Sequence, residues 1–394
     1  MDRRTFGRLA VAAAGAALAA SPWRRAVAAL ARGGPSPYGS LLPPDDLGIQ
    51  LPAGFRSRLI ATARERVAGT DYVWPIFPDG AATFRAGDGG WIYVANSEWV
   101  APDGGGVSAI RFSRSGAIAD AYSICSGTRT NCAGGATPWG TWLTCEEYPA
   151  GNVWECDPRG GVPAVRRPAL GTFQHEAVAV DARHHRLYLT EDVPDGRLYR
   201  FTPAAWPSLE AGALEVAEVS PEGVVAWHAV PDPTGSSTPT RHQVEASTAF
   251  RGGEGIAVSR GHVYFTTKGD DRVWDYDPAR SRLSVLYENA SDPSHQLSGV
   301  DNVTSSRSGD LFVAEDGGNM ELVLIAPDGK VSPLLRVVGQ DGSELAGPAF
   351  SPSGRRLYVN SQRGGGAGLT YEITGPFRAT ARTARTLPGL RVAG

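Results

Sequence analysis

Short apolar segments that contain Tyr, Trp or Phe recur along the chain, and each is followed by a polar or acidic residue and then by a turn with Gly. Short apolar runs bounded by turn residues favour strands. The first strands of the repeat are predicted at Trp91–Ser97, Gly140–Cys145, Leu187–Thr190, His262–Thr267, Asp310–Ala314 and Arg356–Ser361. Second strands are clearest at Val153–Pro158, Leu198–Pro203 and Val273–Pro278.

The spacing of this repeat predicts the fold. The polar residues after the first strands are separated by 48, 45, 77, 47 and 47 residues, and they are Glu98, Glu146, Glu191, Lys268, Glu315 and Gln362. A period in the mid-forties with four strands per unit is typical of propeller blades. Six copies therefore predict an all-β, six-bladed β-propeller, and an ordinary β-sandwich would not explain the constant step.

The long step and the chain ends define the predicted domain organisation. The step of 77 residues contains an insertion at about 203–250, which is polar, rich in Pro and expected to pack as a loop over one face. Residues 29–46 include the Gly-, Pro- and Ser-rich stretch Gly33–Pro44 and are predicted to form a linker. The propeller is expected to occupy residues 47–394.

A second set of positions precedes the first by 14 or 15 residues in every repeat. These positions are Phe84, Cys132, Glu176, Glu254, Asp301 and Pro348. Two residues per blade at constant register are expected to form rings at one end of the central channel. Eight of the twelve positions are Glu, Asp or Cys, and so many carboxylates would repel one another without cations. The pattern predicts a metal cluster at one end of the channel.

The types of the predicted ligands indicate which metals they suit. Seven carboxylates supply hard oxygen atoms that suit calcium, whereas the thiolate of Cys132 is softer and suits iron. In a regular strand the neighbouring acids Glu147, Asp192 and Asp316 would point to the opposite face, and they reach the metals only if the strand bends. His175 is either a ligand, a donor to a ligand or an ordinary buried histidine.

Two stretches resemble the alkaline phosphatases of the PhoX family. They are Asn131–Glu147 (NCAGGATPWGTWLTCEE) and Phe350–Gln362 (FSPSGRRLYVNSQ), with shorter matches between Glu98 and Gln362. The resemblance implies a six-bladed propeller with a calcium–iron centre that hydrolyses phosphomonoesters. It implies that Cys132 binds iron and that Glu176, Glu254 and Asp301 belong to the metal shell. The repeat alone assigns Glu98, Glu146, Glu191 and Glu315 to metal binding.

The sequence departs from the family pattern at the position that would grip phosphate. Where the family has Arg-Pro-Glu-Gly, this chain has Gly252-Gly253-Glu254-Gly255, so that Gly252 stands in the place of the arginine. The family pattern Asn-His-Glu corresponds to Asn96-Ser97-Glu98 in this chain. The family pattern Gln-His-Pro-Gly corresponds to Gln362-Arg363-Gly364-Gly365. Lys268 is expected to replace the arginine, with Arg363 as the second choice.

Two other functions stay open at this point. The missing arginine favours a metal-stabilised propeller that binds a ligand without turnover. Calcium-dependent propeller lactonases, which hydrolyse esters, provide a third possibility.

The N-terminus predicts export. Arg3-Arg4-Thr5-Phe6 precedes the short apolar run Leu9–Ala20, which is typical of a Tat signal peptide over residues 1–28 and is too short for a stable membrane anchor. We therefore expect the Tat export machinery as a partner and a periplasmic or secreted location. The net charge of −3 argues against nucleic acid as a ligand. A monomer that takes a small phosphorylated substrate is expected.

The four cysteines allow one disulfide hypothesis. Cys145 and Cys156 flank a predicted turn, so a hairpin would place them opposite each other. No CxxC pair supports a structural zinc site.

Overall fold

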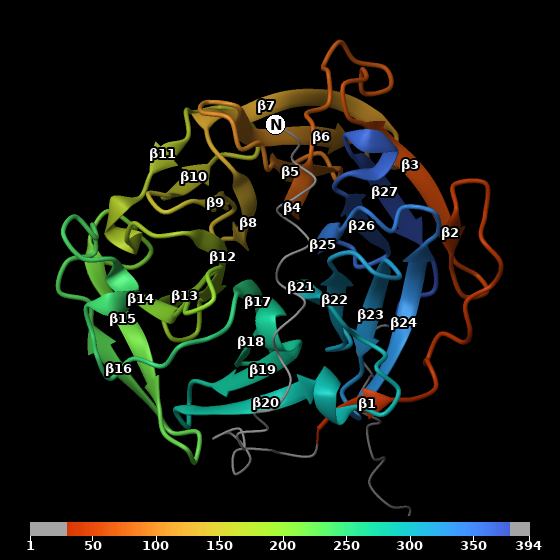
Figure 1. Cartoon of the computed structure of the whole chain (residues 1–394). Coiled ribbons are helices and arrows are strands. Elements are labelled where there is room, and N and C mark those ends of the chain that lie inside the picture. Colours follow the sequence, from red (N-terminus) through yellow and green to blue (C-terminus); the bar gives the residue numbers. More distant parts are fainter. Residues whose placement is uncertain (1–29, 379–394) are drawn as a thin grey trace, which may run out of the picture.

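The structure, a computed structural model, describes residues 30–378 and consists of six sheets arranged in a ring (Figure 1). Within each sheet the strands follow one another in chain order from the innermost strand outward, except that strands from earlier in the chain join the outer edges of the fifth and sixth sheets. The first three sheets contain β4 (Pro78–Arg85), β5 (Trp91–Ser97), β6 (Gly105–Phe112) and β7 (Ile118–Thr128); β8 (Asn131–Ala136), β9 (Trp142–Glu146), β10 (Val153–Cys156) and β11 (Val165–Arg166); and β12 (His175–Asp181), β13 (Arg186–Glu191), β14 (Leu198–Pro203), β15 (Gly212–Val219) and β16 (Val225–Ala229).

The remaining three sheets complete the ring. They contain β17 (Gly253–Ser259), β18 (His262–Thr267), β19 (Arg272–Asp277) and β20 (Arg282–Glu288); β21 (Val300–Ser305), β22 (Leu311–Glu315), β23 (Glu321–Ile325) and β24 (Lys330–Val337), with β1 (Arg32–Gly33) and β2 (Ile49–Gln50) at the edge; and β25 (Leu345–Phe350), β26 (Arg356–Ser361), β27 (Leu369–Thr374) and β3 (Arg56–Thr62). Helical structure in residues 30–378 consists of short 3₁₀ turns: η3 (Pro168–Leu170), η4 (Thr240–His242), η5 (Lys268–Asp270), η6 (Asn289–Ser291) and η7 (Gly364–Gly366). None of the helices in this range is long and apolar enough to cross a membrane.

The ring is closed by strands from both ends of the chain. β3 pairs with β27 in the sixth blade, with Arg56 opposite Thr374 and Thr62 opposite Leu369. Buried aromatic side chains join neighbouring blades: Tyr93 of the first blade lies 4.8 Å from Tyr358 of the sixth, measured between ring centroids. The predicted six-bladed β-propeller is confirmed.

The insertion and the expected linker contribute strands as well as loops. Residues 203–250 contain β15 and β16, so the third blade has five strands, and the loop that follows includes η4. In the expected linker, Arg32–Gly33 form β1, which pairs with Lys330–Val331 of β24. The exposed edge of β24 offers unpaired backbone groups, and β1 satisfies some of them.

All six innermost strands carry a β-bulge at the same level. In β4, for example, Pro78 lies opposite Ser97 and Ala81 opposite Ala95, so the inner strand has one residue more than its partner. A bulge bends a strand and redirects its side chains. The first residue of each bulge is Asp79, Cys132, Glu176, Glu254, Asp301 and Gly347. In blades one and six these positions replace the predicted Phe84 and Pro348.

Candidate metal centre

The bulges and the adjoining strand ends bring acidic side chains from all six blades together. Four groups of three residues each offer ligand atoms that lie within 4.8 Å of one another. Consecutive groups share a residue, so they form one continuous cluster, which we call the acidic cluster. Its members are Asp79, Glu98, Cys132, Glu147, Glu176, Glu254, Asp301, Asp316 and Glu344.

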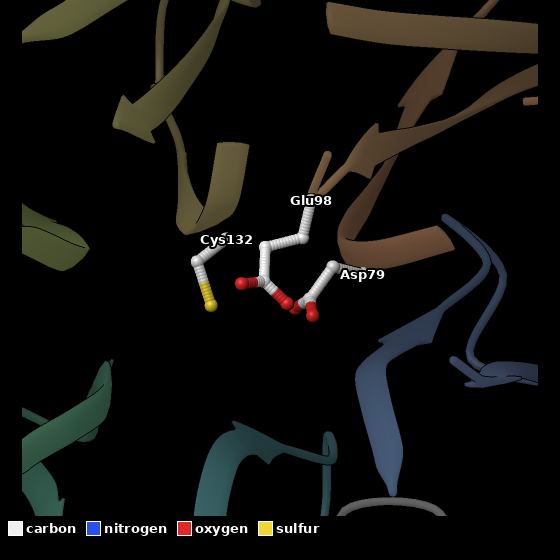
Figure 2. Close-up of side chains that lie close together, drawn as sticks. All are labelled: Asp79, Glu98 and Cys132. Atoms are coloured by element: carbon white, nitrogen blue, oxygen red, sulfur yellow. The ribbon is translucent and has the colours of Figure 1, made fainter. Parts of the chain in front are cut away.

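The first group joins the first two blades. Figure 2 shows the side chains of Asp79, from β4, and Glu98, which follows β5, pointing toward Cys132 of β8. Gln362 donates hydrogen bonds to Asp79 and, over 2.6 Å, to Glu98 Oε2. Burial, together with the charges of Glu344 and Glu98, raises the pKa of Asp79 well above its ordinary value. Burial and the neighbouring Asp79 and Glu176 likewise raise the pKa of the Cys132 thiol. The negative charges of Asp79, Glu98 and Cys132 would therefore be stabilised by a bound cation.

Glu176 lies where two groups meet, and no residue between 30 and 378 compensates its charge. Its side chain is fully buried, and neither carboxylate oxygen has a hydrogen bond to a described residue. Burial, with the charge of Glu254 nearby, raises its pKa well above the ordinary value. An unpaired buried carboxylate is costly. A protein retains such a group when a cation neutralises it, so the donor set fits bound metal ions.

Two basic residues contact the acidic cluster. Lys268 Nζ lies 3.0 Å from Glu254 Oε1, 3.2 Å from Asp301 Oδ2 and 3.3 Å from Asp316 Oδ2. Burial disfavours its ammonium form, but the carboxylates of Asp301 and Glu254 outweigh burial and raise its pKa.

Arg363 is the second basic residue, and it is more exposed. Its guanidinium lies 2.6 Å from Glu344 Oε2. The structure thus places both residues predicted to bind phosphate at the acidic cluster, each already paired with carboxylates.

Three predicted ligands lie outside the acidic cluster and have other partners. Glu146 accepts hydrogen bonds from the backbone N–H of Arg129 (3.0 Å), the backbone N–H of Asn152 (3.2 Å) and Trp154 Nε1 (3.0 Å).

The carboxylates of Glu191 and Glu315 also have hydrogen-bond or ion-pair partners outside the acidic cluster. Glu191 accepts from Tyr199 Oη (2.9 Å) and pairs with Arg241 (3.2 Å). Glu315 accepts from the backbone N–H groups of Ser298 (2.9 Å) and Glu321 (3.1 Å).

In these three blades the predicted residue therefore lies one position before the acid that belongs to or borders the acidic cluster. Glu146, Glu191 and Glu315 are the last residues of their strands, and successive side chains of a strand point to opposite faces. The next residues, Glu147 and Asp316, belong to the acidic cluster. Asp192 lies beside it, with Lys268 and Glu147 as neighbours. Glu98 and Lys268 already occupy the equivalent position, directly after β5 and β18.

His175 lies next to the acidic cluster without joining it. Its ring is buried against Phe173, with 3.6 Å between ring centroids, and its Nε2 lies 3.1 Å from the Gly171 carbonyl oxygen. Burial lowers the pKa of His175 to about 3, so the ring is neutral at ordinary pH. Of the three alternatives, the geometry favours a buried structural histidine.

The backbone at Gly252 adopts a conformation that glycine tolerates best. Its φ is +68°, and a Cβ at this position would lie 2.9 Å from Asp192 Oδ1. An arginine at position 252 would therefore meet backbone strain as well as crowding.

The hypothesis of a Cys145–Cys156 disulfide is wrong. In the β9–β10 hairpin Cys145 lies opposite Val153, and Cys156 lies opposite Trp142. The two cysteines are thus three residues out of register, and all four cysteines are free and buried.

Sequence reasoning missed Asp79 and Glu344. A signal for Asp79 exists: the bulge residue is followed by Gly or Ala in four of the blades, as in Asp79-Gly80 and Glu254-Gly255. A Cβ at Gly80 would lie 2.5 Å from Ala133 Cα, and one at Gly255 would lie 2.5 Å from Val303 N. Neighbouring inner strands approach so closely there that a small residue must follow the acid.

Comparison with known structures extends the fold assignment. Pseudomonas fluorescens PhoX, solved in complex with vanadate, a transition state analogue, is similar with a TM-score of 0.70 and 16% identity, covering 89% of this chain and 99% of that one. A gluconolactonase from Xanthomonas campestris has a TM-score of 0.51 and 12% identity, covering 86% and 99%. The PQQ domain of pyranose dehydrogenase from Coprinopsis cinerea has a TM-score of 0.51 and 13% identity, covering 84% and 98%. At such identities the likeness shows the shared propeller fold.

Sequence comparison identifies the family. A search of curated proteins finds no match. The sequence model of the family "Alkaline phosphatase PhoX" matches residues 104–154 and 148–365. This match covers more than half of the chain and includes most of the acidic cluster. This chain belongs to the PhoX family of alkaline phosphatases.

Proposed function

We propose that this protein is an exported, metal-dependent phosphatase that hydrolyses phosphomonoesters at the acidic cluster. The observation that carries the proposal is the buried, unpaired carboxylate of Glu176 at the centre of that cluster. Family membership supports the reaction type. Hydrolysis of an aryl phosphate by protein of known metal content tests the proposal directly.

The donors of the acidic cluster fit calcium and iron. Eight carboxylates would hold hard cations, and Cys132 is the single soft donor. We propose that Cys132 holds iron together with the carboxylates of its two groups, and that the remaining carboxylates hold calcium. Bound cations would neutralise the phosphate and polarise its oxygen atoms.

The residues of the chain itself supply charge and donors around that site. Lys268 and Arg363 place positive charges at two points of the acidic cluster, and Gln362 offers an amide beside Asp79 and Glu98. Donors aimed at the phosphate oxygens stabilise charge that develops in the transition state. We assign the main share of this role to Lys268, because its ammonium lies within the acidic cluster, whereas the side chain of Arg363 is more exposed.

Replacing Lys268 with Ala is expected to lower kcat/KM for an aryl phosphate by about 10²–10³-fold, the usual scale for one stabilising donor. Steady-state kinetics on metal-loaded protein measures the effect. Lys330→Ala is the matched control, because Lys330 pairs with the exposed Asp328 and lies outside the acidic cluster. An unchanged kcat/KM in Lys268→Ala excludes Lys268 from phosphate binding.

Replacing Cys132 with Ser is expected to remove iron and to leave most of the calcium, because the thiolate selects the softer ion. Elemental analysis of purified protein measures both metals. Cys145→Ser serves as the control, since Cys145 is also buried but lies outside the acidic cluster. Equal iron content in Cys132→Ser and wild type would remove Cys132 from the iron site.

A binding protein without turnover is the second candidate. It is favoured by the pairing of both Lys268 and Arg363 with carboxylates, and by glycine at position 252. A metal-loaded protein that turns over no phosphomonoester supports this alternative. Hydrolysis of an aryl ester with calcium alone would instead support a lactonase.

We further propose that the protein acts as a monomer on a small phosphorylated substrate, outside the cytoplasm. The twin-arginine sequence at Arg3-Arg4, which lies outside the described residues, supports the location. Cell fractionation of the full chain tests the location.

A further inference from the structure

Arginine side chains gather around a hollow far from the acidic cluster. The hollow has a volume of about 960 Å³, and none of the residues between 30 and 378 that line it is acidic. Six arginines line it: Arg85, Arg114, Arg307, Arg355, Arg356 and Arg378.

The hollow lies at the opposite end of the inner strands from the acidic cluster. β4 carries Asp79 near its start and Arg85 as its last residue, six residues and therefore roughly 20 Å further along. Arg307 and Arg355 lie in the turns that follow β21 and β25. The hollow is thus a separate feature from the proposed phosphatase site, and its function does not depend on that proposal.

Most of these arginines have no acidic partner. Arg356 pairs with Glu372, and Arg378 pairs with Asp310. Within residues 30–378, no ion pair involves the other four arginines: Arg85, Arg114, Arg307 and Arg355. Residues 379–394 contain Arg382, Arg385 and Arg391 but no Asp or Glu, so their side chains offer no compensating charge.

Two of the unpaired guanidinium groups are held close together. Arg85 Nη2 and Arg307 Nη2 both donate to the carbonyl oxygen of Pro352. Like charges that share one acceptor repel each other unless an anion lies nearby. Each group also keeps further N–H donors free to bind a second acceptor.

We propose that this hollow binds a soluble, multiply charged oxyanion, such as a polyphosphorylated or polysulfated small molecule. Guanidinium groups match the oxygen atoms of phosphate and sulfate through paired N–H donors. Several arginines around one concave site favour a ligand with several anionic groups over a single phosphate. A flat bilayer surface cannot enter a hollow, which favours a soluble ligand over anionic lipid.

Calorimetric titration of the metal-loaded full chain with sucrose octasulfate tests the proposal. This probe carries several oxyanions and no phosphomonoester, so its binding is independent of phosphatase activity. We expect one binding site in wild type, an affinity that falls as salt is added, and a rise in Tm with the probe. The double variant Arg85→Gln/Arg307→Gln should bind the probe about 10²-fold more weakly than wild type. This corresponds to about tenfold for each charged contact that is lost.

The control removes the same charge elsewhere. Arg166→Gln/Arg183→Gln replaces two exposed arginines of blades two and three that lie outside the hollow. It should bind the probe as wild type does, and the Tm of each variant without probe shows that it is folded. Because Arg85 and Arg307 are exposed, their replacement should preserve folding.

Three results would overturn the proposal. The first is no binding to wild type at low salt. The second is equal weakening in both double variants, which indicates nonspecific attraction to surface charge. The third is arginine-dependent binding to phosphatidylglycerol vesicles without binding to the soluble probe, which assigns the hollow to a membrane surface instead.

Discussion

The variant Glu176→Gln is expected to change stability in opposite directions with and without bound metal. In chelator-treated protein it should raise Tm, because it removes a carboxyl group whose charged form is disfavoured by burial and by the nearby charge of Glu254. In metal-loaded protein it should lower Tm relative to wild type, because a ligand that stabilises the folded state through bound metal is lost. Hydrolysis of an aryl phosphate should fall by about 10³-fold or more.

Thermal unfolding in both metal states, together with elemental analysis, measures these effects. Glu372→Gln is the matched control: Glu372 is also buried, but it is paired with Arg356 and Tyr358 and lies outside the acidic cluster. This control should lower Tm by a similar amount in both states. If Glu176→Gln stabilises the protein to the same extent with and without chelator, Glu176 binds no metal.

The fold was predictable because each blade repeats the same chemistry at a nearly constant period. Exposed turns separate short apolar strands, and this pattern survives even where sequence identity to other propellers is low. The insertion before Phe250 did not hide the period, because its additional strand, β16, lies at the outer edge of the blade.

The acidic cluster was predictable only in part, because the distance between its two positions varies among blades. Cys132 precedes Glu147 by 15 residues, but Asp79 precedes Glu98 by 19. β4 and β5 contain 8 and 7 residues, whereas β8 and β9 contain 6 and 5, so the hairpin of the first blade is longer. Counting back a fixed 14 residues from Glu98 leads to Phe84, which packs in the core instead.

Adjacent acids such as Glu146 and Glu147 posed a second problem. Either one can face the channel, depending on which residue ends the strand. The donors that bind Glu146 come from Arg129, Asn152 and Trp154, and the sequence gives no indication that these groups meet. The three-dimensional arrangement was needed to assign Glu146 to the support of the blade and Glu147 to the cluster.

The same substitution at these two neighbours is expected to have different consequences. Glu146→Gln should lower the free energy of unfolding by about 2–4 kcal/mol. The NH₂ group of the new amide would face N–H donors whose hydrogen bonds the carboxylate had accepted. The loss should be similar with and without chelator, and metal content should stay unchanged. Glu147→Gln should instead lower metal affinity by at least about 10-fold.

Glu147→Gln should also leave the chelated protein at least as stable as wild type. Burial, with the charges of Glu98 and Asp192, raises the pKa of Glu147 to about 8, so its charge is unfavourable when no metal compensates it. Denaturant unfolding in both metal states and elemental analysis of the two variants separate the roles. A Glu146→Gln protein that loses metal but unfolds like wild type would contradict the assignment, and Glu146 would then be the metal ligand that the repeat pattern predicts.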